Sequence, residues 1–234
     1  MPFRYGSLRT EPKEHSVRFL LIVFLLLTLP VFAQSKEGVV PINGGHDFVY
    51  VKPVNRIFPA ARPAAGMVTI FSNLGKGNNV YNGAAGTGVL GKNVPNQPYP
   101  EWVANGFTPA ANYTVMEIQV GVSWVEGITN AVILSLNEDN GGKPGKALFT
   151  TDFTTLPDFG TCCTLQTATL IKGVPVTQGT QYWVVLRTSP NNQGTWDVWN
   201  NNFADMQGPF SNSTGHGWNK QSTQELGAFA VFGQ

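Results

Sequence analysis

The sequence has little charge of either sign. Charged residues make up 12% of the 234 residues, and 15 Lys and Arg nearly balance 14 Asp and Glu. That share is about half of what a soluble protein usually carries. Without a basic excess the chain has no field that neutralises phosphates, so neither nucleic acid nor an anionic lipid surface is an expected partner. Asn, Gln, Thr, Ser and Gly supply the polarity instead, which is typical of an extracellular β-protein.

Cysteine and histidine are also scarce, with two and three residues respectively. The two cysteines, Cys162 and Cys163, are adjacent, and neither His46 nor His216 stands at a zinc-ligand spacing from them. In an oxidising compartment we expect a vicinal disulfide. A trans peptide holds neighbouring Cα atoms ~3.8 Å apart, so this bond needs a distorted or cis peptide. Two free thiols and an intermolecular bridge are the alternatives.

Beyond residue 33 no long apolar run occurs, and no segment keeps a helical period over three turns. Residues 1–33 predict a cleaved secretory signal peptide, with a basic start, an apolar stretch from residue 19 and a small residue, Ala33, before the cut. A membrane anchor is the alternative, but a span needs about 20 apolar residues and this stretch offers roughly 14. Gln34 stands where a lipoprotein would have Cys, so we expect a secreted, extracellular protein.

Residues 34–66 form a proline-rich lead-in. Prolines cannot donate ladder hydrogen bonds, so this segment is expected to hold at most short edge strands, of which residues 46–51 are the best candidate.

Residues 67–234 are dominated by a two-residue hydrophobic period, which predicts β-strands. The clearest case is residues 113–125. Residues 181–188 and 228–232 are apolar on both faces, which indicates central strands. Short strands separated by Gly- and Asn-rich turns predict an all-β fold: an antiparallel two-sheet β-sandwich, jelly-roll-like in type. Weaker strands are expected at residues 68–72, 102–107, 147–153, 165–171 and 195–200.

Two segments resemble ligand-binding loops. Residues 86–92 satisfy G-x-G-x-x-G, but the prolines that follow exclude the helix that this motif needs, so we expect a glycine-rich turn region. Asn137, Asp139 and Asn140 offer oxygen ligands for calcium, although the EF-hand pattern fails. The alternative for these three residues is a hairpin loop.

The aromatic residues suggest a function. Indole rings beside amide and carboxylate groups are suited to sugars, since the ring covers the C–H face and the amides bind the hydroxyls. The alternative is that alternation places one of Trp196 and Trp199 in the core. The candidate ligand-binding residues are Trp196, Asp197, Trp199, Asn200, His216 and Trp218.

Residues 67–234 resemble the bacterial choice-of-anchor R domains, which are exported modules often followed by a surface-sorting tail. The matching segments are residues 106–114, 132–145, 159–163, 179–185 and 228–233. The resemblance implies a bacterial, exported β-sandwich and supplies no catalytic residues. Because no sorting tail follows the last segment, free release is the expectation.

We therefore expect a non-catalytic extracellular binding module with saccharide as its leading ligand. No cofactor is expected, calcium at Asn137, Asp139 and Asn140 being the one candidate. The alternatives are a structural or adhesive cell-envelope protein that binds other proteins, and a glycan hydrolase, which would need two of the scattered carboxylates to face each other.

Overall fold

The computed structural model describes residues 65–94, 97–189 and 194–234, together with the backbone of residues 38–42 and 47–51. The chain divides into two units, Met1–Gln34 and Ser35–Gln234, and the predicted signal peptide lies outside the described residues. In the described ranges the regular structure is entirely β-strand. No helix in those ranges has the length and apolar character needed to cross a membrane.

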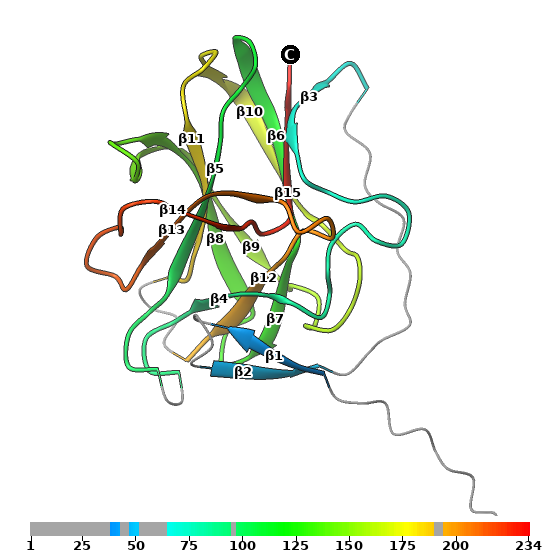
Figure 1. Ribbon diagram of the computed structural model, residues 1–234, viewed down its shortest axis with the longest axis vertical. Helices are drawn as coiled ribbons and strands as arrows, with labels where there is room; N and C mark the ends of the chain where they lie inside the picture. The colour runs from blue at the N-terminus through cyan, green and yellow to red at the C-terminus, as the bar shows by residue number, and fades with distance from the viewer. Residues whose placement is uncertain (1–37, 43–46, 52–64, 95–96, 190–193) are drawn as a thin grey trace, which may run out of the picture. The chain divides into compact units, whose positions relative to one another are not determined.

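The described strands pair in antiparallel fashion throughout and form four sheets (Figure 1). The largest runs in the order β14 (Ser222–Glu225), β13 (Gln207–Ser213), β5 (Trp102–Phe107), β11 (Tyr182–Arg187), β8 (Ala131–Asp139) and β9 (Pro144–Thr154). The second runs β10 (Gln166–Val176), β6 (Tyr113–Val120), β15 (Phe229–Gly233) and β3 (Val68–Ser72). A third contains β4 (Gly86–Leu90), β12 (Trp196–Asn200) and β7 (Val122–Glu126), and β1 (Gly38–Ile42) pairs with β2 (Asp47–Val51).

This arrangement confirms the predicted all-β, sandwich-like fold. Tyr182, Val184 and Leu186 of β11 enter the main apolar core together with residues of β6 and β15 from the four-stranded sheet. Alternation puts Trp183 and Val185 on the opposite face of β11, where they are buried in a smaller cluster. As predicted, β11 is central, between β5 and β8, and β15 is central, between β6 and β3.

Three aromatic side chains connect the sheets inside this core. The indole of Trp199 on β12 meets Phe229 on β15 edge to face, with ring centroids 5.9 Å apart. Phe229 meets Phe107 on β5 in the same manner at 6.4 Å. Each ring belongs to a different sheet, so these two contacts join the three-, four- and six-stranded sheets.

The long strand predicted at residues 113–125 is divided in two. Gly121 separates β6 from β7, and the chain passes there from the four-stranded to the three-stranded sheet. The backbone N–H of Gly121 donates to Ala228, and its carbonyl accepts from Asn200. A Cβ on Gly121 would stand 2.7 Å from the ring of Tyr81, so glycine is required by this close approach.

Our expectation of a glycine-rich turn at residues 86–92 was wrong for its first five residues, which form strand β4. They pair with β12 in regular register, from Gly86 opposite Asn200 to Leu90 opposite Trp196. Glycine is used here because the strands approach closely: a Cβ on Gly86 would collide with Val198 and with the carbonyl of Trp199.

Gly86→Ala should therefore destabilise the fold although alanine suits a strand no worse than glycine. We expect a loss of about 1–3 kcal/mol, the usual range for overpacking. Thr150→Ala on the exposed face of the edge strand β9 is the control, with a change within about 0.5 kcal/mol. Urea denaturation of both variants measures the difference, and equal stabilities would contradict the close packing described here.

Candidate functional site

The segment from Trp196 to Asn200 is structural, which corrects our prediction of a binding face there. Trp199 is 0% exposed, and its Nε1 donates a 3.0 Å hydrogen bond to the carbonyl of Ala228. Asn200 is also buried, and its Oδ1 accepts a 2.6 Å hydrogen bond from Ser123 Oγ. Trp196 lies on the other face of β12, half-buried against Phe159. Alternation thus separates the two tryptophans, and neither forms an aromatic surface.

Asp197 is the second correction, because its carboxyl group is turned into the protein. It pairs across the strands with Val89 and Trp124, shares their face of the sheet and is 0% exposed. Neither carboxyl oxygen has a hydrogen-bond partner among the described residues. Burial raises the pKa of Asp197 well above its ordinary value, since desolvation disfavours the charged form. A carboxyl group buried in this way cannot bind a saccharide at the surface.

The calcium candidates hold the β8–β9 hairpin together. Asp139 accepts from Trp183 Nε1 at 2.8 Å and from Gln181 Nε2 at 3.2 Å, and the backbone N–H of Gly142 donates to both of its carboxyl oxygens. Asn137 accepts from Ser135 Oγ at 2.7 Å. Neutral hydrogen-bond donors therefore occupy the side-chain oxygens of Asp139 and Asn137. In the described ranges, no three His, Cys, Asp or Glu side chains gather as a metal site would require.

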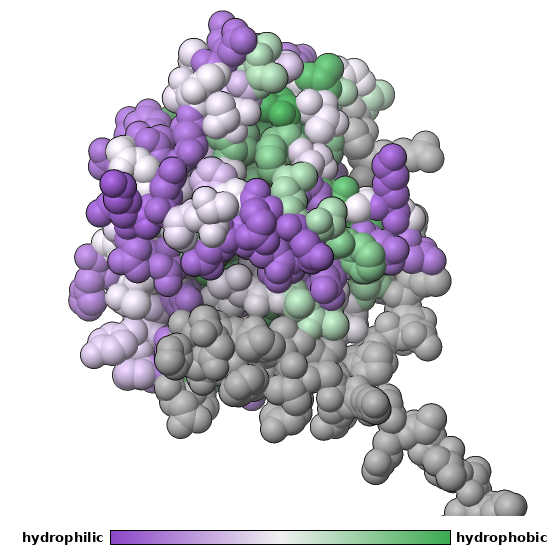
Figure 2. All heavy atoms as spheres, viewed as in Figure 1, coloured by the Kyte–Doolittle hydropathy of each residue, from purple (hydrophilic) through white to green (hydrophobic). Residues whose placement is uncertain are grey.

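Residues 214–221 cross the outer face of the six-stranded sheet. The backbone N–H of Asn219 donates to Asn212 at 2.9 Å, and Ser211 Oγ donates to the carbonyl of Asn219 at 2.7 Å. At the far end, the N–H of Gln221 donates to Gly142 in the β8–β9 hairpin at 2.9 Å. In Figure 2, the side of the viewed face that carries β13 and β14 is mainly polar, and apolar atoms gather toward β3 and β6.

Trp218, in the segment 214–221, lies over the outer face of the six-stranded sheet. It packs against the buried cluster of Ala104, Trp183 and Val185. Its ring centroid is 6.4 Å from that of Trp102 on β5, with a 50° angle between the ring planes. The guanidinium of Arg187 lies 5.9 Å from the centroid of Trp102, a cation–π geometry. Aromatic and cationic side chains from three segments therefore gather on one face.

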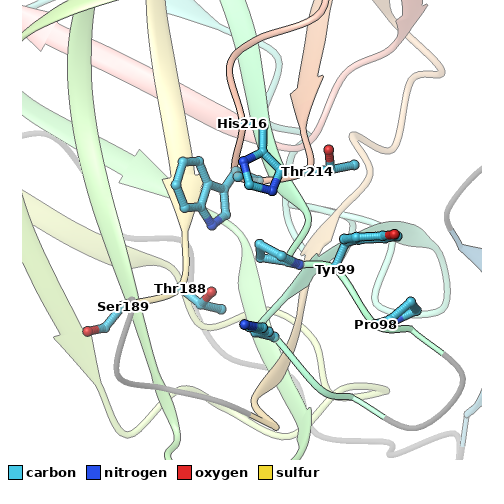
Figure 3. A pocket seen from close by; sticks show the side chains of 10 residues that line it. Pro98, Tyr99, Thr188, Ser189, Thr214 and His216 are labelled. Atoms are coloured by element: carbon cyan, nitrogen blue, oxygen red, sulfur yellow. The ribbon is translucent and has the colours of Figure 1, made fainter.

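A hollow of about 370 Å³ opens beside Trp102 (Figure 3). In this view Thr188 and Ser189 line one side, His216 and Thr214 the top, and Tyr99 and Pro98 the opposite side. Tyr99 is 56% exposed, so most of its ring faces solvent. The hollow combines an aromatic wall with hydroxyl groups and the ammonium of Lys92.

A second hollow of about 490 Å³ adjoins the first, because His216 and Thr214 line both. Trp218, Asn140, Lys143 and Asn219 are among its other walls. We call the two together the His216 groove. Its walls come from the segment before β5, from the end of β11, from the β8–β9 hairpin and from residues 214–219.

Two of the six predicted ligand-binding residues, His216 and Trp218, lie in this groove, and four do not. Tyr99, Trp102 and Lys92 were missed. The Pro98-Tyr99-Pro100 sequence was the available signal, because an aromatic residue between two prolines is excluded from a regular central strand and remains at the surface.

The cysteine pair lies apart from the groove. Cys162 and Cys163 are joined as a disulfide across a cis peptide bond. Cys163 is buried with Tyr81, and the Sγ of Cys162 lies 3.4 Å from the carbonyl oxygen of Tyr81. Burial raises the pKa of Tyr81 to about 12. The loops at residues 78–83 and 161–164 thus pack together, and the redox state of the pair in solution stays a prediction.

These features define an all-β, sandwich-like protein with an aromatic surface groove. No protein-family model, no curated protein and no solved structure matches the chain. The resemblance to choice-of-anchor R domains therefore stays a prediction.

Trp199→Ala should strongly destabilise the protein because it removes the indole that contacts Phe229. We expect about 3–5 kcal/mol in denaturant unfolding, the usual cost of deleting a buried aromatic side chain. Trp199→Phe keeps most of the apolar volume and should cost less. An unchanged midpoint for the alanine variant would show that Trp199 lies outside the core.

Asp197→Asn should change how stability depends on pH. The folded state holds the Asp197 proton more tightly than the unfolded chain does, whose Asp pKa is about 3.9. Stability of the wild type should therefore fall as the pH rises above about 4, until the raised pKa of the folded state is passed.

The measurement is the Tm of both proteins between pH 4 and pH 8. The variant lacks this ionisation, so the Tm of the variant minus that of the wild type should increase as the pH rises. Burial also raises the pKa of Glu225, with a contribution from Asp205, but that effect is common to both proteins and cancels in the difference. A Tm difference independent of pH would refute the raised pKa of Asp197.

Proposed function

We propose that this protein is a secreted, non-catalytic binding module, similar to the choice-of-anchor R domains, and that it binds a saccharide in the His216 groove. The observation that carries the proposal is the exposed ring of Tyr99 in the wall of a 370 Å³ hollow that also contains Trp102 and several hydroxyl groups. Small-ligand sites typically have volumes of about 300–1,000 Å³ with a few placed polar groups.

The chemistry of the walls suits a sugar ring. Tyr99 and Trp102 offer aromatic surface for an apolar C–H face, and the exposed Thr214 offers a hydroxyl group that can hydrogen-bond to the sugar. The second hollow adds Trp218 and the amides of Asn140 and Asn219. Two adjoining hollows with the same kinds of groups would accept consecutive sugar units of one chain.

A protein-binding role in the cell envelope is the second candidate. Phe203, 50% exposed, and Met206 lie on the loop between β12 and β13, and both present apolar surface to solvent. Apolar side chains gathered on one loop are a common feature of protein contacts. The two roles are separable because this loop contributes no described residue to the His216 groove.

Tyr99→Ala should remove saccharide binding without unfolding the protein. On a glycan array followed by titration calorimetry, we expect at least about a 10-fold loss of affinity, since aromatic contacts at a binding site are worth of the order of 1–2 kcal/mol. Stability should change by less than about 0.5 kcal/mol, because the side chain is largely exposed.

Phe203→Ala is the matched control, since this ring is nearly as exposed as Tyr99 but lies outside the groove. It should leave saccharide affinity unchanged. If the wild type binds no glycan on the array, the proposal of saccharide binding is wrong. Release of reducing ends from an oligosaccharide would instead identify the protein as a hydrolase.

A further inference from the structure

The charges that line the His216 groove are of one sign. Lys92 lines the first hollow, Lys143 lines the second, and His216 stands between them. None of the described lining residues of either hollow is Asp or Glu. The guanidinium of Arg187 lies over the ring of Trp102 and adds a further cation close to the first hollow. Since the whole chain carries 15 basic and 14 acidic residues, this excess belongs to the groove and not to the protein at large.

The carboxylates closest in the chain to these walls are turned away from a ligand. Glu101, between Pro100 and Trp102, is 3% exposed. Asp139, next to Asn140, has its oxygens occupied by Trp183 Nε1, Gln181 Nε2 and the N–H of Gly142. A ligand in the groove would therefore meet ammonium groups, hydroxyls and amides, with little repulsion for an anion.

We propose that the groove selects an acidic saccharide, one that bears carboxylate or sulfate groups. The sugar ring lies against Tyr99 and Trp102, and its anionic substituents reach Lys92 in one hollow and Lys143 in the other. This inference rests on the proposed saccharide function and adds the class of ligand. Groups of opposite charge at a binding surface mainly give specificity and a salt-dependent association rate.

The test compares ligands that differ only in charge. Calorimetry measures the affinity of the purified protein for an oligogalacturonate, for its neutral methyl ester, and for a sulfated oligosaccharide beside its unsulfated parent. We expect each acidic ligand to bind about 10-fold more tightly than its neutral counterpart at low salt, and the difference to shrink at 0.5 M salt because exposed charges are screened.

The variant Lys92→Gln/Lys143→Gln should lose this preference while keeping the affinity for the neutral ligands. Lys76→Gln/Lys172→Gln removes the same charge at exposed positions outside the groove and should retain the preference. Preference for either acidic ligand, lost only in the first variant, supports the proposal.

Three results would overturn it. Equal affinity for acidic and neutral ligands leaves the saccharide function standing and refutes the selection for charge. A preference that survives in the Lys92→Gln/Lys143→Gln variant places the charge recognition elsewhere. No binding of any of the four oligosaccharides refutes the proposed function together with this inference.

Discussion

Contact between aromatic rings from three sheets is the constraint on which this fold depends. Trp199, Phe229 and Phe107 each come from a different sheet, and the middle ring touches both of the others. The backbone is adjusted to make room for them. A Cβ at Gly227 would meet the indole of Trp199, and a Cβ at Gly86 would meet the carbonyl of the same tryptophan. Glycine at 227 thus makes room for the indole of Trp199, and glycine at 86 allows β4 to approach the backbone of β12 that carries it.

The candidate site is kept separate from this core by the sheet itself. Along β5, Val103 and Phe107 point into the main core, whereas Trp102 lies on the opposite face beside Trp218. Residues of the groove can therefore change without creating a cavity in the interior. Asp197, whose polar side chain lies inside, takes no part in the groove and affects stability and its dependence on pH.

Alternation of side chains made most of the fold predictable. It located β3, β5 and β11 closely, and it identified the central strands from runs that are apolar on both faces. It failed in β4, because Gly86 and Gly88 leave too few side chains in this short strand for a two-residue period to be detected. It also missed β13 and β14, whose polar residues resemble a loop.

The site was predictable only in part, for a different reason. Alternation says that Trp196 and Trp199 point to opposite faces of their strand, but it does not say which face is inward. The groove brings Lys92 and Tyr99 together with His216, which lies more than a hundred residues later in the chain. No local sequence pattern predicts that these residues lie close together, because their proximity follows from the pairing of β5 with β13 and from the loop that follows β13.

The hydrogen bond from Gln221 to Gly142 ties the end of the 214–221 segment to the β8–β9 hairpin. Both walls of the second hollow are therefore loops fastened to each other. Lengthening or shortening either loop would widen or narrow this hollow and leave the strand register unchanged. The architecture thus allows the size of the accepted ligand to evolve independently of the scaffold.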